Sequence, residues 1–145
     1  MSDRAGQPAE VLLVEDDDGD VNLIKEAFAA GSGTKVHLTV ASDGAEALEL
    51  LRGRAPGPRP EIIILDLNMP KFDGRQFLRE IKDDPNLRRI PVIVFTSSNA
   101  DEEVIAAYSA HANCYICKPL NFQGFLATMQ LIRDFWLSTV MLPVR

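Results

Sequence analysis

The chain has 145 residues, of which 46% are hydrophobic and 25% charged, and its net charge at pH 7 is −6. This length predicts a single domain, residues 1–145, with a hydrophobic core of its own. The acidic excess argues against a nucleic-acid-binding surface, which needs clustered basic residues. The sequence has neither an apolar run of membrane-spanning length nor a signal peptide at its start, and its two cysteines make no disulfide framework. We therefore expect a cytoplasmic protein with no membrane contact.

The first part of the chain alternates short apolar runs with amphipathic segments. The predicted order is a strand at 11–14, a helix from Asp20 to the glycines at 31–33, a strand at 36–40, a helix at 45–52 and a surface loop at 53–60. In the first helix, Val21, Ile24 and Phe28 fall at helical spacing. Asp20 stands at its start and can cap it, because an aspartate side chain can accept the free backbone N–H groups of the first turn.

The central stretch, residues 61–70, is the one around which the chain is organised. Four consecutive branched apolar residues, 62–65, lie between Pro60 and Pro70 and predict a strand that is buried on both faces, as in a parallel sheet. Asp66 stands at the last position of this strand. Ligands of open α/β sheets bind at the carboxyl ends of the strands, so Asp66 is a candidate functional residue.

The remainder of the chain repeats the same alternation. The prediction is a turn at 71–74, a helix carrying Phe77, Leu78 and Ile81, and a strand at 91–96. The next helix is capped by Asp101 and has Val104, Ile105 and Tyr108 on one face. A strand at 115–117, a helix at about 122–136 and an apolar tail at 137–145 follow. Five strands alternating with five helices predict an α/β fold in which helices cover both faces of a parallel sheet. We expect the core to span about 10–136.

Polar residues stand at the ends of four of the predicted strands. They are Glu15 and Asp16 after the first, Asp66 at the end of the third, Thr96 at the end of the fourth and Lys118 after the fifth. Parallel strands bring these ends to one edge, where carboxylates about 4 Å apart repel by about 4 kcal/mol per pair at an effective dielectric constant of about 20. Such a cluster suits Mg²⁺. Because a lysine and a hydroxyl stand beside the carboxylates, the cluster predicts a site at which a carboxylate accepts a phosphoryl group.

Over about residues 10–132 the sequence resembles the receiver domain of two-component response regulators. The matching positions are the acidic pair Glu15-Asp16, the phosphoacceptor Asp66, Asn68 two residues after it, the hydroxyl residue Thr96, the aromatic Tyr115 and the lysine of Lys118-Pro119. The resemblance implies a flavodoxin-like, doubly wound sheet of five parallel strands in the order 2-1-3-4-5, with five helices. It also implies that Asp66 takes a phosphoryl group from a sensor histidine kinase.

Further roles follow from the same resemblance. Asp16, Asp66 and the backbone carbonyl of Asn68 would bind Mg²⁺, and Glu15 would reach the ion directly or through water. Thr96 and Tyr115 would act as the switch that changes the partner-binding surface. The chain would be a signalling switch that assists its own phosphorylation and dephosphorylation, and not an enzyme acting on other molecules.

A narrower likeness is to single-domain regulators partnered with phytochrome-type histidine kinases. The segments that carry it are Glu15-Asp16-Asp17, Gly19-Asp20, Asp84-Pro85, Arg88-Arg89-Ile90-Pro91, Phe135-Trp136-Leu137 and Leu142-Pro143. This likeness implies a partner of that kinase class.

Other functions fit the sequence less well than a phosphorylated signalling switch does. A Mg²⁺-dependent phosphatase with an aspartyl-phosphate intermediate usually places a second carboxylate two residues after the nucleophile, where this chain has Asn68. A docking scaffold that is never phosphorylated is disfavoured because all the required groups are present. A transcription factor is not expected, because only 26 residues follow Pro119. Asp16-Asp17-Asp18-Gly19 does not fit a calcium loop, because Val14 and Lys25 would occupy its first and twelfth positions.

Two other features carry expectations. Cys114 and Cys117 have the spacing of a metal or redox pair, but residues three apart on a strand face opposite sides, so we expect buried apolar side chains. In the last helix, the expected core-facing stripe consists of Phe125, Met129, Ile132 and Trp136. Leu131 and Phe135 then lie on another face, and five apolar residues follow in the tail. Contiguous apolar surface of this kind usually marks an interface, so we expect a homodimer through the last helix and the tail. The alternative is a tail that folds back over its own domain.

Overall fold

A computed structural model of the chain describes residues 7–30, 33–53, 59–69 and 74–143. Its strands are β1 (Ala9–Val14), β2 (Val36–Ala41), β3 (Ile62–Leu65), β4 (Val92–Thr96) and β5 (Cys114–Cys117). All neighbouring strands pair in parallel, in the order β2-β1-β3-β4-β5. The predicted sheet and its strand order are confirmed.

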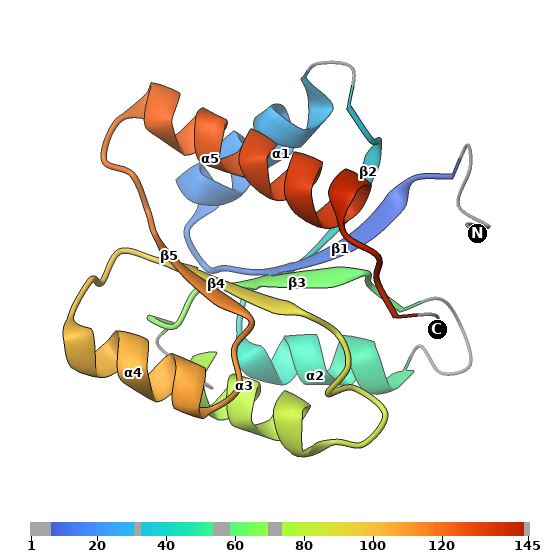
Figure 1. Cartoon of the computed structure of the whole chain (residues 1–145), viewed down its shortest axis with the longest axis vertical. Coiled ribbons are helices and arrows are strands. Elements are labelled where there is room, and N and C mark those ends of the chain that lie inside the picture. The colour runs from blue at the N-terminus through green and yellow to red at the C-terminus, as the bar shows by residue number, and fades with distance from the viewer. Residues whose placement is uncertain (1–6, 31–32, 54–58, 70–73, 144–145) are drawn as a thin grey trace.

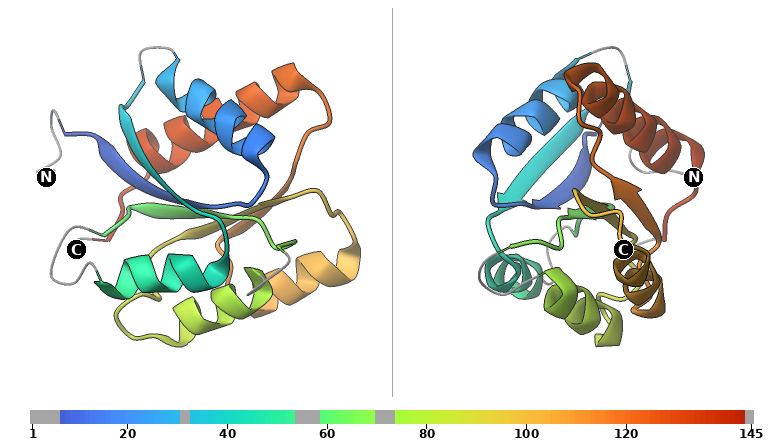
Figure 2. Two further views of the ribbon diagram at one scale, coloured as in Figure 1. Left: turned by 180° about the vertical axis from the view of Figure 1, so that it is seen from behind. Right: turned by 90° about the vertical axis from the view of Figure 1, so that its left-hand side faces the viewer.

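Helices cover both faces of this sheet (Figures 1 and 2). They are α1 (Asp18–Ala29), α2 (Gly44–Gly53), α3 (Gly74–Asp83), α4 (Asp101–Ser109) and α5 (Phe122–Asp134), and α5 continues into a π-helical segment, η1 (Phe135–Thr139). α1 and α5 lie on one face, and α2, α3 and α4 lie on the other (Figure 1). Among the described helices, none has the length and apolarity that a bilayer span requires.

β3 lies at the centre of the sheet, and all four of its side chains are buried. Successive side chains of a strand point to opposite faces, so β3 contributes to both layers of the core. Ile62 and Ile64 pack in the cluster under α1 and α5, whereas Ile63 and Leu65 pack in the cluster under α2 and α3. The continuous apolar run therefore reflects burial on both faces, as predicted.

Two predicted helix caps are wrong. The cap of α1 is Asp17, whose Oδ1 accepts the backbone N–H of Asp20 at 2.9 Å, so Asp20 lies inside the helix. The cap position of α4 is Ala100, which makes no side-chain capping bond, and Asp101 is the first helical residue. Before α2, Asp43 Oδ1 accepts the backbone N–H of Glu46 at 2.9 Å. Gly31, Ser32 and residues 71–73 of the predicted turn lie outside the described residues.

The shared face predicted for α4 does not enter the core. Within α4, all of whose residues are described, only Ala107 is buried. Ile105 is 65% exposed and Tyr108 48% exposed. The expectation of buried cysteines is also wrong, since Cys114 is only half-buried and Cys117 is exposed. Both cysteines lie on β5, an edge strand that the helices cover less completely than β3.

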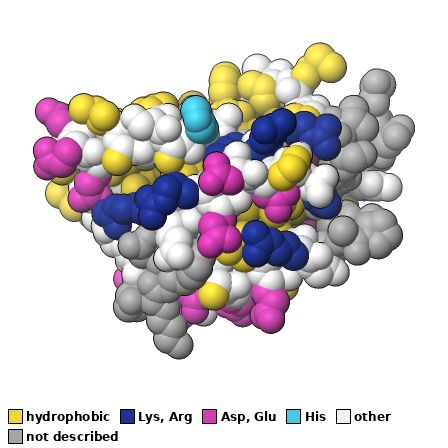
Figure 3. All heavy atoms as spheres, turned by 90° about the horizontal axis from the view of Figure 1, so that it is seen from below, with side chains coloured by type: hydrophobic (Ala, Val, Ile, Leu, Met, Phe, Trp, Pro, Cys, Tyr) yellow, Lys and Arg dark blue, Asp and Glu magenta, His cyan; other side chains and the backbone are white. Residues whose placement is uncertain are grey.

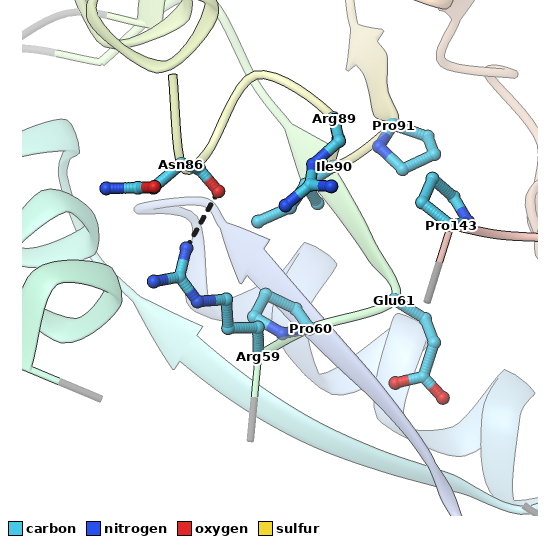
Figure 4. A pocket seen from close by; sticks show the side chains of 8 residues that line it. All are labelled: Arg59, Pro60, Glu61, Asn86, Arg89, Ile90, Pro91 and Pro143. Carbon is cyan, nitrogen blue, oxygen red and sulfur yellow. Dashed lines mark hydrogen bonds between the residues drawn. The ribbon is translucent and has the colours of Figure 1, made fainter. Parts of the chain in front are cut away.

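The end of the chain packs partly against its own domain. Leu137 of η1 is buried, so the core extends past residue 136, and Leu142 packs against the same cluster. Farther on, Pro143 lies beside Pro91 at the rim of a small pocket, where Arg59 donates to the Asn86 carbonyl at 2.8 Å (Figure 4). The predicted tail is therefore divided, because Met141 between these contacts is 95% exposed.

Gly74, the first residue of α3, fixes this helix against the end of β3. A Cβ at Gly74 would fall against the carbonyl oxygen of Asp66 and 2.7 Å from the Cα of Leu67. Both neighbours are backbone atoms, which cannot move aside without displacing β3. This glycine is therefore required for the close approach of α3 to the carboxyl edge of the sheet.

We predict that Gly74→Ala lowers the free energy of unfolding by about 1–3 kcal/mol, the usual cost of overpacking. The matched control is Gly53→Ala at the end of α2, where an added Cβ meets nothing within 4 Å. That variant should be as stable as the wild type or more stable by up to about 1 kcal/mol. Urea unfolding of the three proteins measures the difference, and equal midpoints for both variants would contradict the role assigned to Gly74.

Candidate functional site

The predicted site residues of four strands meet at the carboxyl edge of the sheet. The backbone ladder continues one residue past the strands, because the N–H groups of Glu15, Asp66 and Lys118 donate to the carbonyls of Ala41, Val14 and Thr96 at 3.0, 3.0 and 2.7 Å. These bonds fix the Cα positions from which the functional side chains extend. The geometry of the cluster therefore rests on the rigid sheet and not on a flexible loop.

Lys118 is enclosed by carboxylates. Its Nζ lies 2.8 Å from Glu15, 2.7 Å from Asp20 and 3.1 Å from Asp66. Burial opposes the charge of Lys118, but the hydrogen bonds that its ammonium group donates to Asp20 and Glu15 and the charges of Glu15 and Asp66 outweigh burial and raise its pKa above the ordinary value. Lys118 is therefore a permanent cation at physiological pH.

Glu15 is the most deeply buried acid of the cluster. Burial raises its pKa to about 7, and the neighbouring charge of Asp66 acts in the same direction. The hydrogen bond and the charge of Lys118 and the N–H of Asp17 lower the pKa but do not restore the usual value. Negative charge is thus crowded here beyond what one ammonium group compensates.

The carboxylate of Asp66 is held at both oxygens. Oδ1 accepts the hydroxyl of Thr96 at 2.8 Å and the backbone N–H of Asn68 at 3.0 Å, whereas Oδ2 accepts Lys118. The side-chain amide of Asn68 in turn donates to the Thr96 hydroxyl at 3.1 Å. Asp66 follows directly after β3, one residue beyond the strand end to which the sequence assigned it.

Three of the acids could hold a metal ion together. One oxygen each from Glu15, Asp16 and Asp66 lies within 4.8 Å of the other two. Oxygen-only ligands at this separation suit a small hard cation such as Mg²⁺, which keeps several waters and needs few carboxylates. The residues present therefore fit the expected ion, and the assignment of particular ligands, Asn68 included, stays a prediction.

Tyr115 lies on β5, apart from the acidic cluster. Its hydroxyl donates to the Ser98 carbonyl at 2.8 Å, in the segment that follows Thr96. Burial raises its pKa above the ordinary value, so the hydroxyl keeps its proton. Its ring packs at the margin of the α2 and α3 cluster, and its role as a switch residue is not tested by this geometry.

Two residues of the site were missed by the sequence reasoning. Asp20 had been assigned as a helix cap, but it reaches Lys118 from inside the first turn of α1. Arg75 carried no expectation, yet its guanidinium lies 2.7 Å from Glu103 and near Asn68. Asp20 is the fifth acid between residues 15 and 20, a density of acids that could have flagged it, whereas nothing local in the sequence identifies Arg75.

The comparisons with known proteins agree with this arrangement. The model of the response regulator receiver domain family matches residues 11–130. Response regulator Rcp1 of Synechocystis sp. is 43% identical over 146 residues, which cover 99% of both chains. The crystal structure of the phosphorylated cyanobacterial phytochrome response regulator RcpA is similar with a TM-score of 0.89 and 41% identity, covering 94% of this chain and 99% of that one. The Mn²⁺-bound form of Rcp1 gives a TM-score of 0.86 and 42% identity, covering 94% and 100%.

We predict that Asp16→Asn stabilises the metal-free protein by about 1 kcal/mol, because it removes one exposed charge from a crowded cluster. In excess Mg²⁺ the wild type should gain stability through binding to the folded state, and the variant should lose most of that gain. Urea unfolding in chelator and in Mg²⁺ measures both effects. Glu49→Gln, an exposed acid on α2, is the control and should respond to Mg²⁺ as the wild type does. An undiminished Mg²⁺ effect in Asp16→Asn would exclude Asp16 as a ligand.

Proposed function

The chain belongs to the response regulator receiver family of two-component signalling, and we propose that it is a switch activated by phosphorylation of Asp66. The observation that carries the proposal is the surroundings of this carboxylate. A hydroxyl, an ammonium group and two further acids converge on it from the ends of three other strands. We also propose that residues 1–145 form one receiver domain.

The chemistry proposed for Asp66 is transfer from a kinase phosphohistidine. A carboxylate oxygen of Asp66 forms a bond to phosphorus as the bond from phosphorus to the histidine nitrogen breaks, and the histidine leaves as neutral imidazole after taking up a proton. Lys118 and the Thr96 hydroxyl supply positive charge and a hydrogen-bond donor to the transferred oxygens. Mg²⁺, held by Glu15, Asp16, Asp66 and Asn68, would neutralise part of the charge on the phosphoryl group.

The switch proposed here uses Thr96 and Tyr115. In the structure the Thr96 hydroxyl donates to Asp66 itself. An aspartyl phosphate adds about −1.5 to −2 charges, which would draw this hydroxyl and Lys118 toward the phosphoryl oxygens. Movement of Thr96 would change the space beside Tyr115 and so the surface of α4, β5 and α5. The two forms would be in equilibrium, with phosphorylation biasing it.

The phosphatase alternative has no support from the site. The side chain two residues after Asp66 is the amide of Asn68, which cannot serve as an acid or base, and it is engaged with the Thr96 hydroxyl. Members of the receiver family are generally signalling switches and not enzymes. We propose that the catalytic assistance of this chain is limited to its own phosphorylation and dephosphorylation.

The proposed partner is a sensor histidine kinase of the phytochrome type. The support is the likeness to RcpA, which is described as a cyanobacterial phytochrome response regulator. The proposed location is the cytoplasm, where reducing conditions keep thiols such as Cys114 and Cys117 free. We propose no nucleic-acid or membrane contact for this domain.

A homodimer through α5 and the end of the chain is also proposed. Phe125, Met129 and Ile132 of α5 are buried, as the sequence predicted, whereas Leu131 is 67% exposed and Phe135 49% exposed. With Met141 they offer apolar side chains along one exposed side of the C-terminal elements. A second copy of the chain, related by a two-fold axis, would cover them.

We predict that Asp66→Asn abolishes phosphorylation. Acetyl phosphate with Mg²⁺ should add one phosphoryl group to the wild type, and mass spectrometry of the intact protein measures it. Asp101→Asn, an exposed acid of α4, is the control and should label as the wild type does. A labelled Asp66→Asn protein, or a wild type that never labels, would overturn the assignment of the acceptor.

We predict that Leu131→Glu converts the dimer to a monomer at micromolar concentration without loss of stability, because it charges an exposed position of α5. Ile105→Glu is the matched control, since Ile105 is equally exposed but lies on α4. Sedimentation measures the mass of each. This choice avoids Leu137 and Leu142, whose removal would damage the core. A monomeric wild type, or equal dimers in both variants, would refute this assembly.

A further inference from the structure

α4 is held to the domain by few contacts of its own. Only Ala107 of this fully described helix is buried, and its first turn has no side-chain cap. A hydrogen bond joins it to β5, from the backbone N–H of Tyr115 to the Tyr108 hydroxyl at 3.2 Å. A helix with so little buried apolar surface depends more than its neighbours on polar contacts at its ends.

One such contact is the ion pair between Glu103 of α4 and Arg75 of α3. The atoms Arg75 Nη2 and Glu103 Oε1 are 2.7 Å apart, and both side chains are partly buried. α3 and α4 lie next to one another on the same face of the sheet (Figures 1 and 2). Acidic and basic side chains lie close together over this face (Figure 3). The separation of 2.7 Å between Arg75 and Glu103 shows that these two form a close ion pair. The pair joins the amino-terminal turns of the two helices.

Arg75 also touches the loop that carries the phosphoacceptor. Its guanidinium lies 3.4 Å from the Leu67 carbonyl and 3.5 Å from Oδ1 of Asn68. Each contact is long for a hydrogen bond and weak alone. Gly74 fixes the start of α3 against Asp66, however, so the adjoining Arg75 is placed over Asn68 by the backbone.

A continuous series of polar contacts therefore runs from Asp66 to α4. Asp66 accepts a hydrogen bond from the Thr96 hydroxyl, and this hydroxyl accepts one from the side-chain amide of Asn68. Asn68 lies against the guanidinium of Arg75, which forms the ion pair with Glu103. It leaves Asp66 by way of α3 and reaches α4 at its first turn. It is separate from the contact between Tyr115 and Ser98, which joins β5 to the segment between β4 and α4.

We propose that Arg75 is a positioning residue that holds α4 in its resting place through Glu103 and reports the state of Asp66 to it through Asn68. This inference rests on the proposed function, since it assumes that Thr96 turns toward a phosphoryl group on Asp66. When Thr96 turns, the amide of Asn68 loses its acceptor and is free to rotate against Arg75. The ion pair with Glu103 then loosens, and α4 is released.

The test combines beryllofluoride, a stable mimic of the phosphoryl group, with hydrogen exchange of α4. In the wild type, binding should speed amide exchange across Val104–Ser109. In Glu103→Gln and in Arg75→Gln, exchange there should be fast before binding, with little further increase. By linkage, both variants should bind beryllofluoride about two- to fivefold more tightly, as expected for loss of a partly exposed ion pair in the resting form.

A charge exchange separates anchoring from reporting. In the double variant Arg75→Glu with Glu103→Arg the ion pair can form again, but the carboxylate at position 75 repels Oδ1 of Asn68. α4 should then be protected in the resting form and should no longer respond to beryllofluoride. The matched control is Glu80→Gln, which breaks the 3.4 Å pair between Arg52 of α2 and Glu80 of α3, away from Asp66, and should behave as the wild type.

The outcomes distinguish this inference from the proposed function. Fluorine NMR shows whether beryllofluoride binds at all, with Asp66→Asn as the blank. A wild type without a bound signal would overturn the proposed function. A bound signal together with wild-type exchange and affinity in Glu103→Gln and Arg75→Gln would overturn the role of Arg75 and leave the function standing. A double variant that still responds to beryllofluoride would remove the reporting step alone.

Discussion

The crowding of negative charge at the carboxyl edge of the sheet is the constraint on which the site depends. Glu15, Asp20 and Asp66 all contact the single ammonium group of Lys118, and Asp16 lies within reach of two of these acids. The backbone ladder holds these residues in place, so the acids cannot separate to relieve their repulsion. The apolar strands beneath supply the stability that this arrangement requires. Partial neutralisation makes the edge receptive to a cation and to a phosphoryl group.

The two sides of the sheet contribute differently to this design. On one side α5 is tied to α1, because the buried Arg133 donates to the carbonyls of Phe28 and Ala30 at the end of α1. On the other side α4 buries one residue. α1 and α5 are therefore held together more firmly than α4 is held to the sheet, so α4 can move more easily when the state of Asp66 changes. The structure thus favours α4 as the element that responds.

Much of the fold and of the site followed from the sequence, for identifiable reasons. The uninterrupted apolar run at 62–65 predicted a central strand, and the rule that strand ends meet at one edge brought together residues far apart in the chain. Hydrophobic periodicity shows which side chains share a helix face, but it does not show whether another element covers that face. The predicted face of α4 with Ile105 and Tyr108 is therefore exposed in the structure. Asp17 and Asp20 are equally good caps by composition, and only the geometry of the first turn decides between them. Arg75 meets Glu103 across 28 residues of chain, a pairing that no local pattern predicts.

The order in which the chain is synthesised gives the dispersed site a further property. Asp66 precedes Lys118 by 52 residues, which the ribosome adds in roughly 3–10 seconds at common rates of translation. Until β5 has been made and has paired with β4, the nascent chain contains Asp66 without the ammonium group of Lys118 beside it. A product released early, before residue 118, would have Asp66 but not this partner. Under the proposed function, competence to receive a phosphoryl group would therefore be acquired late in synthesis.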